Sequence, residues 1–582
     1  MLDLVLRGGL VVDGSGSPGH VDDVGVRDGL VVSVGGPRED ARQVVDATEL
    51  VVAPGFVDIH THYDAQIQWD PLLSPSSAHG TTTLIGGNCG FTLAPMAEAQ
   101  ADYLVKMLAA VEGMPLAALQ AGVRLDWSSF GAWLDGIEGR TALNVGFLAG
   151  HSTLRRLVMA DAAGERAATE AEIARMASLL AESVDAGALG FSSSWNPAHS
   201  DGDSLPVPSR AAALDELVTL AGVLRSRPGT VVEFVPGLSA TFERPQIEAM
   251  IAMSRAADRS LNWNLLRLDE PDFGIAERCL APSTEAGTSG AAVYALTNPE
   301  PLNFRVTFSG PLVLDNLPGW LDTMRLPVPQ RIEALSDPDR RRHLERAVDD
   351  ASPLSGVLGL MAGWGRLAVG ETFSAANEGL VGRTVGQVAQ QRGSSPFDTM
   401  LDIALADDLR TYFVLPRRGD DDETWRLRAQ VWRDPRTVLG GSDAGAHLDL
   451  MCGASYTTAL LGEGVRERGL LPLEEAVQLL TDAPARFYGI RGRGRIAEGY
   501  HADLAVFDPA RIASGPIHTR DDLPAGASRL YRESIGIEHV FVNGTEVVHD
   551  NEATGDLPGT VLRSYRDFDT RDVASHAAAL RG

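Results

Sequence analysis

Two histidines separated by one residue have the types and spacing for metal chemistry. His60 and His62 occur in "GFVDIHTHYD", directly after an apolar run that is typical of a buried strand. Because side chains alternate between the two faces of a strand, both imidazoles should point the same way, toward one ion. Thirteen histidines in 582 residues give about 0.3 such pairs by chance, so the pair needs support from its surroundings.

An aspartate far along the chain offers a carboxylate for the same site. Asp443 occurs in "TVLGGSDAGAHLD", also after an apolar run. A carboxylate at a strand end could bind the ion and take a proton from a water molecule. The alternative is that Asp443 caps a following helix. Its place at a strand end, like that of the histidine pair, favours the metal site.

The elements that must position these residues alternate between strand-like and helical patterns. Stretches 170–187 and 212–227 have apolar residues at helical spacing. Repeated βα units favour the α/β class with a parallel sheet, and the length suits a TIM-like (β/α)8 barrel, whose catalytic residues lie at the C-terminal strand ends. Apolar runs that end in small or polar residues, as such strands do, occur at 82–90, 142–152, 187–194, 230–236, 261–266 and 437–445.

Short β-rich runs separated by Gly and Asp turns mark both chain ends. We expect residues 1–54 and 490–565 to form one small β-sandwich domain, with Asn543-Gly544 as a hairpin turn. The barrel would span residues 55–489, with insertions around 270–430, where strand signals are sparse. Residues 566–582 would form a C-terminal tail.

Composition excludes several classes of partner. The net charge of −28 argues against nucleic acid and anionic membranes, which both need a basic surface. No apolar run is long enough to span a bilayer, and the N-terminus lacks the features of a secretory signal. Three cysteines form no disulfide framework, which fits a reducing cytoplasm. We expect a cytoplasmic protein with a small-molecule substrate, and a homo-oligomer remains possible.

Longer motifs resemble the amidohydrolase superfamily, specifically its N-acyl-D-amino-acid deacylase (D-aminoacylase-like) branch. The resemblance covers most of the chain, and "GNCG" and "GHSTLR" are specific to this branch. The motifs include "LVLRGGLVVDGSG", "VVAPGFVDIHTHYD", "HGTTTLIGGNCGFTLAP", "GHSTLRRLVMA", "AGALGFSSS", "GGSDAGAHLD" and "TDAPARFYGIRGRGRIAEGYHADLAVFDP".

The resemblance implies a barrel, a small β-sandwich and zinc-assisted hydrolysis of an amide C–N bond. It makes His60, His62 and Cys89 metal ligands and Asp443 the general base. Without the resemblance, Cys89 could equally be a buried small hydrophobe. Many amidohydrolases bridge two metals with a carboxylated lysine, but Lys106 is the only lysine and lies in a helix-like stretch. We therefore expect one firmly bound zinc ion rather than a bridged pair, held by His60, His62 and Asp443, whereas Cys89 could bind a second ion or remain a spectator thiol.

The chain departs from the family pattern at the fifth and sixth strands. The family places further histidine ligands there, but "TVVEFVP" and "SLNWNLL" have none. Glu233 could replace one as a ligand, or could form a buried salt bridge. Asn262 and Asn264 alternate onto one face and could bind a substrate amide.

Two residues of "AGHSTLRR" are candidates for substrate binding. His151 would lie at the barrel mouth, with a hydrogen bond that fixes the loop as the alternative. Arg155 could pair with a substrate carboxylate, although an arginine at a helix start is often solvated.

The leading hypothesis is a metal-dependent hydrolase that cleaves an amide C–N bond, in an N-acyl amino acid or similar small substrate. A superfamily hydrolase of a cyclic amide, dipeptide or carbamate is the nearest alternative. A metal-poor binding protein on the same scaffold is the alternative from another class.

Overall fold

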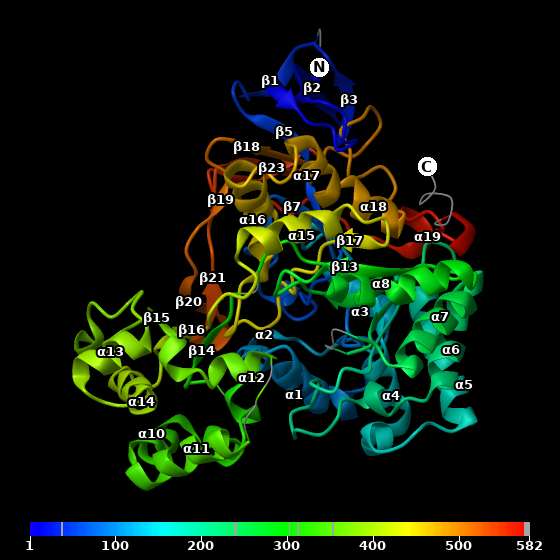
Figure 1. Cartoon of the computed structure of the whole chain (residues 1–582). Helices are drawn as coiled ribbons and strands as arrows, with labels where there is room; N and C mark the ends of the chain where they lie inside the picture. Colours follow the sequence, from blue (N-terminus) through cyan, green and yellow to red (C-terminus); the bar gives the residue numbers. More distant parts are fainter. Residues whose placement is uncertain are drawn as a thin grey trace.

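The computed structural model describes residues 1–36, 39–237, 241–301, 303–310, 313–351, 354 and 356–575. It has the α/β class, with parallel strands at the centre and helices packed around them (Figure 1). No helix of the described residues has both the length and the apolar character required to cross a membrane.

Two parallel sheets contain the strands that carry the motif residues. The smaller has the order β6-β7-β8, and the larger has the order β17-β13-β12-β11-β10-β9. Their bounds are β6 (Phe56–Asp58), β7 (Thr81–Gly86), β8 (Asn144–Phe147), β9 (Ala149–Gly150), β10 (Gly190–Ser194), β11 (Val231–Val235), β12 (Leu261–Leu266), β13 (Val293–Thr297) and β17 (Thr437–Leu439).

Short connections link the two sheets at both sides. Only Leu148 separates β8 from β9, and an isolated parallel bridge joins Thr61 to Ala444, beyond the ends of β6 and β17. All residues of β10, β11 and β13 are buried, as expected for parallel strands covered on both faces.

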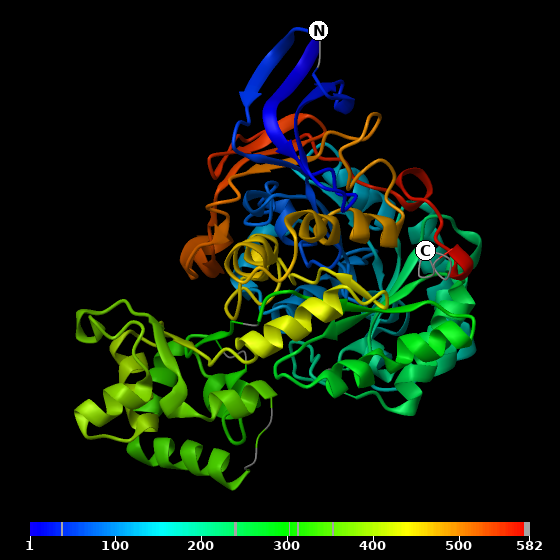
Figure 2. The ribbon, with the colours of Figure 1, turned by 45° about the horizontal axis from the view of Figure 1, so that its top comes forward.

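Amphipathic helices alternate with these strands and cover them on one side (Figure 2). They are α4 (His151–Met159), α5 (Glu170–Asp185), α6 (Leu214–Gly222), α7 (Arg244–Ala257) and α8 (Phe273–Thr288). α5 begins with a capping box, in which Thr169 and Glu172 satisfy each other's backbone N–H groups. α5 and α6 confirm the helices that the apolar spacing predicts at 170–187 and 212–227.

A nine-stranded sheet joins the two chain ends. Its main order is β25-β24-β23-β18-β5-β1-β2-β3, and β4 pairs with β1 on the side. The strands are β1 (Leu2–Val11), β2 (His20–Arg27), β3 (Leu30–Val34), β4 (Ala41–Asp46), β5 (Val51–Pro54), β18 (Leu504–Phe507), β23 (Ile537–Val542), β24 (Thr545–His549) and β25 (Glu552–Ala553). β5, which directly precedes β6, pairs with β18, so that residues some 450 positions apart in the chain are hydrogen-bonded neighbours.

A second hydrophobic core lies in the segment between β13 and β17. It extends from Val306 to Leu415 and also includes Leu450. This insertion lobe projects from the rest of the molecule and contains α10 (Val328–Ser336), α11 (Pro338–Asp350), α12 (Gly356–Met361), α13 (Val385–Arg392) and α14 (Pro396–Ala406) (Figure 2). The core begins later than the 270–430 stretch in which insertions were expected, because β13 is one of the parallel strands and α8 packs against it.

Near its end the chain packs against the body. Phe568 is buried and bridges to Ile490. The last part of the expected tail, 576–582, lies outside the described residues.

Candidate metal centre and active site

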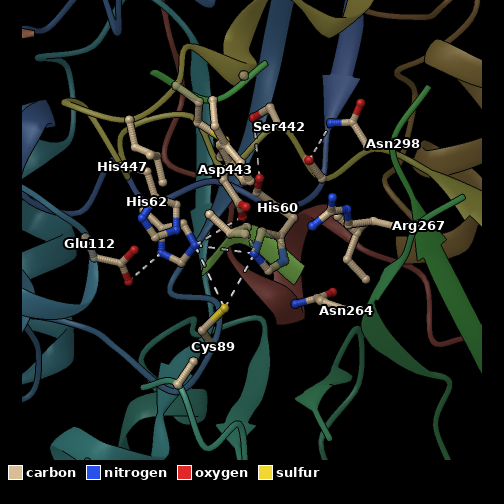
Figure 3. A pocket seen from close by; sticks show the side chains of 18 of the residues that line it. His60, His62, Cys89, Glu112, Asn264, Arg267, Asn298, Ser442, Asp443 and His447 are labelled. Atoms are coloured by element: carbon tan, nitrogen blue, oxygen red, sulfur yellow. Dashed lines mark hydrogen bonds and ion pairs between the residues drawn. The ribbon is translucent and has the colours of Figure 1, made fainter. Parts of the chain in front are cut away.

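The two histidines after β6 and Cys89 after β7 converge on one point (Figure 3). The Nε2 atoms of His60 and His62 are 3.3 Å apart. Cys89 Sγ lies 3.6 Å from His60 Nε2 and 3.9 Å from His62 Nε2. All three side chains are buried, and each directs one potential ligand atom into the same space.

Asp443 faces this cluster from the segment after β17. Its Oδ1 lies 3.0 Å from His60 Nε2 and 3.6 Å from His62 Nε2. No helix begins at Asp443 in the described residues, since the next helical turn starts at Gly453. The capping alternative is therefore wrong. Asp443 has φ +51°, a left-handed conformation that Asp adopts more readily than most residues.

The separations between these atoms fit a zinc ion. Zinc binds histidine nitrogen at about 2.0–2.1 Å and thiolate sulfur at about 2.3 Å, usually in a tetrahedron. Those lengths place two nitrogens about 3.3 Å apart and nitrogen about 3.5 Å from sulfur. The observed 3.3 Å and 3.6 Å match, and the 3.9 Å separation is slightly longer. The residues present therefore suit the metal.

Burial and neighbouring groups shift the pKa values of the side chains around the cluster. Although burial opposes it, hydrogen bonds to His60 and His62 hold the pKa of Asp443 well below its usual range. Burial also works against a charged His62, but nearby Glu112 and Asp443 raise its pKa well above the ordinary value. Burial raises the pKa of the Cys89 thiol. A cation at the cluster would favour the thiolate that burial disfavours.

The cluster lies in a cavity of about 490 Å³. Polar groups in its wall include Arg267, Asn298 and His199, and apolar groups come partly from the insertion lobe, such as Val313 and Leu358. An apolar wall with a few convergent polar groups is typical of a small-molecule site.

Comparison with known proteins identifies the family to which this site belongs. The sequence pattern of the amidohydrolase family matches residues 43–548. The chain belongs to the amidohydrolase family.

Two curated relatives cover nearly the whole of this amidohydrolase. A D-aminoacylase from Alcaligenes xylosoxydans xylosoxydans is 29% identical, over 96% of this chain and 97% of its own length. An N-acyl-D-aspartate deacylase from the same organism is 30% identical, over 96% and 95%.

A solved structure agrees with them. The crystal structure of N-acyl-D-glutamate deacylase from Bordetella bronchiseptica, complexed with zinc and a phosphonate inhibitor, has a TM-score of 0.63 at 25% identity. It covers 97% of this chain and 99% of that one. The amidohydrolase described here is thus a metal-dependent hydrolase of amide C–N bonds, as the motifs predicted.

Glu233, a candidate ligand on β11, lies beside the cluster but is engaged elsewhere. Its Oε2 accepts a hydrogen bond from the backbone N–H of Cys89 at 2.9 Å, and its Oε1 accepts one from the Asn264 side chain. Burial raises the pKa of Glu233 to about 8. Glu233 therefore anchors the loop that carries Cys89, which has φ +57°. Asn264 also lines the cavity, as a substrate-binding residue would.

His151 and Arg155, the other candidates for substrate binding, lie away from the cavity. Both are fully buried in α4 and contact Glu216 of α6. His151 Nε2 is 2.8 Å from Glu216 Oε1, and its Nδ1 is 2.8 Å from Ser193 Oγ. Neither residue is among those that line the cavity in the described chain. This placement gives the expectation of substrate contact no support. For His151 it favours the alternative, a fixing hydrogen bond; for Arg155 the alternative of a solvated side chain is wrong, because the side chain is fully buried against Glu216.

Several residues of the site were missed in the sequence. Glu112, which follows α1 (Ala101–Val111), places Oε1 3.1 Å from His62 Nδ1. His447 lines the cavity with a buried Nδ1 that has no hydrogen-bond partner among the described residues. Arg267, just after β12, reaches the cavity beside Asn298 (Figure 3). Arg267 could have been found in the sequence, because it is a polar residue directly after a strand. Glu112 follows a helix, and its position in the sequence gives no indication that it belongs to the site.

Proposed function

We propose that this amidohydrolase removes the acyl group from N-acyl-D-amino acids or closely similar small amides. The observation that carries the proposal is Asp443 facing the His60–His62–Cys89 cluster inside a cavity of small-molecule size. The curated relatives, named as D-aminoacylase and N-acyl-D-aspartate deacylase, support the substrate class.

One zinc ion would be held by His60, His62 and Cys89, with Asp443 on the remaining side. The match between the ligand separations and zinc geometry supports this assignment. Among the described residues, the ligand atoms that converge on one point come from His60, His62 and Cys89 and not from Glu233, and the single lysine, Lys106, forms an exposed ion pair with Asp102. These placements favour one ion over a bridged pair. When bound, zinc would polarise the substrate carbonyl and acidify water.

The protein's own residues would then orient the substrate and move the proton. Asp443 makes both histidine contacts through Oδ1, so we assign the proton transfer to Oδ2. This oxygen would take the proton from the attacking water and give it to the leaving amine nitrogen as the amide C–N bond breaks. Arg267 would bind the substrate carboxylate through its guanidinium, and Asn264 would bind the amide.

We also infer that the two parallel sheets form one closed TIM-like barrel. Eight strand positions would run in the order β6, β7, β8 with β9, β10, β11, β12, β13 and β17. The Thr61–Ala444 bridge supports closure, as does the backbone hydrogen bond from His62 N to Ala444 O at 2.7 Å. The metal ligands would then lie at the C-terminal strand ends.

Replacement of Asp443 by asparagine tests the proposed base. Asparagine keeps the size of the side chain and tolerates the left-handed backbone, so Asp443→Asn should fold normally. We expect kcat for N-acyl-D-amino acids to fall about 10²–10⁴-fold, with the metal retained. Asp102→Asn, at an exposed ion pair, should leave kcat unchanged. Near wild-type turnover by Asp443→Asn would overturn the assignment.

A substrate panel separates the proposal from its alternatives. N-acyl-D-amino acids, their L-enantiomers, cyclic imides, dipeptides and carbamates should be compared at equal metal loading. Preference for a cyclic imide or a carbamate would assign the enzyme to another amidohydrolase activity.

A further inference from the structure

A second group of potential metal ligands lies on the nine-stranded sheet. His539 on β23 stands directly opposite His549 on β24. Glu546 of β24 lies between them: its Oε1 is 2.6 Å from His539 Nδ1 and 2.8 Å from His549 Nδ1. The two rings meet edge to face, with centroids 4.7 Å apart. Two imidazoles and one carboxylate thus surround one point.

An irregularity in the strand pairing creates this arrangement. Val540 pairs with Val548, but Phe541 pairs with Glu546, so Val547 is an extra residue in β24. In a regular strand, residues three apart such as Glu546 and His549 point to opposite faces. The extra residue of a β-bulge reverses this alternation and brings both onto the face of His539.

The geometry points to a second metal site, formed by His539, Glu546 and His549, for a divalent transition metal ion such as Zn²⁺ or Cu²⁺. Imidazole and carboxylate are suitable ligands for these ions. With bonds of about 2.0–2.1 Å, neighbouring ligand atoms lie about 2.9 Å apart in the square-planar arrangement typical of Cu²⁺ and about 3.3 Å apart in the zinc tetrahedron. The observed 2.6 Å and 2.8 Å therefore suit Cu²⁺ after a small expansion and Zn²⁺ after a larger one.

Two neighbouring residues support the proposal. Gln43 of β4 donates a hydrogen bond from Nε2 to the other oxygen of Glu546 at 3.2 Å, which orients the carboxylate while Oε1 faces the imidazoles. Asp550 Oδ2 lies 3.7 Å from His549 Nε2 and adds negative charge. His549 is 55% exposed, so an ion and its remaining water ligands could enter from solvent.

This site is separate from the catalytic cluster. The described residues that line the cavity do not include any of these three. All three lie on β23 and β24, near the C-terminal end of the chain. Because an ion that binds only the folded state stabilises that state, metal at this site would hold the β23–β24 hairpin together.

Equilibrium dialysis of the full-length protein against Zn²⁺, followed by elemental analysis, tests the proposal. We expect His549→Ala and Glu546→Gln to bind about one Zn²⁺ fewer per chain than the wild type, or to bind the second Zn²⁺ at least about tenfold more weakly. Hydrolytic activity should be unchanged in both variants. His20→Ala is the matched control, since His20 lies on β2 of the same sheet, is 54% exposed and forms, among the residues that the structure describes, only a long ion pair with Asp22 at 4.0 Å.

Spectra of bound Cu²⁺ provide a second readout. Electron paramagnetic resonance of the wild type should show a species with nitrogen ligands that persists in His62→Ala and is absent from His549→Ala. Equal Zn²⁺ stoichiometry and affinity in wild type, His549→Ala and Glu546→Gln would overturn the proposal. The three residues would then form only a hydrogen-bonded cluster.

Discussion

At the residue scale, Glu112 contacts the side of the His62 ring that faces away from the cluster. Its Oε1 lies 3.1 Å from His62 Nδ1, in a buried ion pair that leaves Nε2 to face His60 and Cys89. Although burial opposes it, the interaction with His62 lowers the pKa of Glu112. A carboxylate on the far nitrogen fixes the tautomer of a metal-binding histidine and raises its basicity.

Replacement of Glu112 by glutamine should therefore weaken the metal site without removing a ligand. We expect metal affinity to fall roughly 10–100-fold in Glu112→Gln, because the amide cannot balance the charge on the imidazole. Competition with a chelator of known affinity measures this. The exposed Glu98 provides the control Glu98→Gln. Unchanged metal affinity in Glu112→Gln would mean that the carboxylate does not orient His62.

At the scale of elements, a buried ion pair joins α4 to α6. Arg155 and Glu216 are both fully buried, and Arg155 also donates to the backbone carbonyls of Ala163 and Arg166. Since His151 contacts the same carboxylate, the motif "GHSTLRR" connects two helices behind the strands. These contacts predict that the motif stabilises the fold.

Glu216→Gln should lower the free energy of unfolding by about 3–5 kcal/mol, because it leaves the Arg155 charge buried without a counter-charge. Glu285→Gln breaks an exposed pair with Arg244 that also joins two helices, α7 and α8, and should cost much less, because solvent screens the charges. Urea denaturation measures both. A large rise in KM with unchanged stability in Glu216→Gln would instead favour substrate contact by this motif.

The effect of Glu216→Gln on the free energy of unfolding should also depend on pH. Although burial opposes it, hydrogen bonds to His151 and Arg155 lower the pKa of Glu216 from its ordinary value of 4.5. A carboxylate with a lowered folded-state pKa contributes stability above its unfolded value, and this is lost as the pH falls through the folded value. The difference in unfolding free energy between wild type and Glu216→Gln should therefore be full at neutral pH and shrink as the pH is lowered below 4.5.

Across the whole molecule, the sequence predicted the features that depend on local patterns. His60, His62 and Asp443 could be found because each follows an apolar run, and strand ends gather at one edge of a parallel sheet. Glu112 and the Arg155–Glu216 pair could not, because their contacts depend on how helices pack over residues distant in sequence. The division into domains at 54, 490 and 565 stays a prediction, although β5 and β18 do pair.

The insertion lobe forms part of the wall of the cavity, and the parallel strands form another part. This arrangement leads to a prediction about substrate preference. Leu358 of α12 and Val313 belong to the segment with its own core, yet both line the cavity that contains the metal cluster. An apolar wall favours substrates with a large apolar group and does little for small ones. The lobe should therefore set substrate preference without taking part in bond cleavage.

Leu358→Ser should raise KM roughly tenfold for N-acyl-D-amino acids with a bulky apolar group, and leave KM for small acetylated substrates and kcat for both nearly unchanged. Steady-state kinetics on a series of substrates of increasing apolar size measures the effect. Val381→Ser is the control, because Val381 belongs to the same lobe and is 57% exposed. An equal change for every substrate would indicate that the variant disturbs the site as a whole. No change for any substrate would mean that this wall does not touch the substrate, and preference would then have to arise from residues on the strand side of the cavity, such as Arg267 and Asn298.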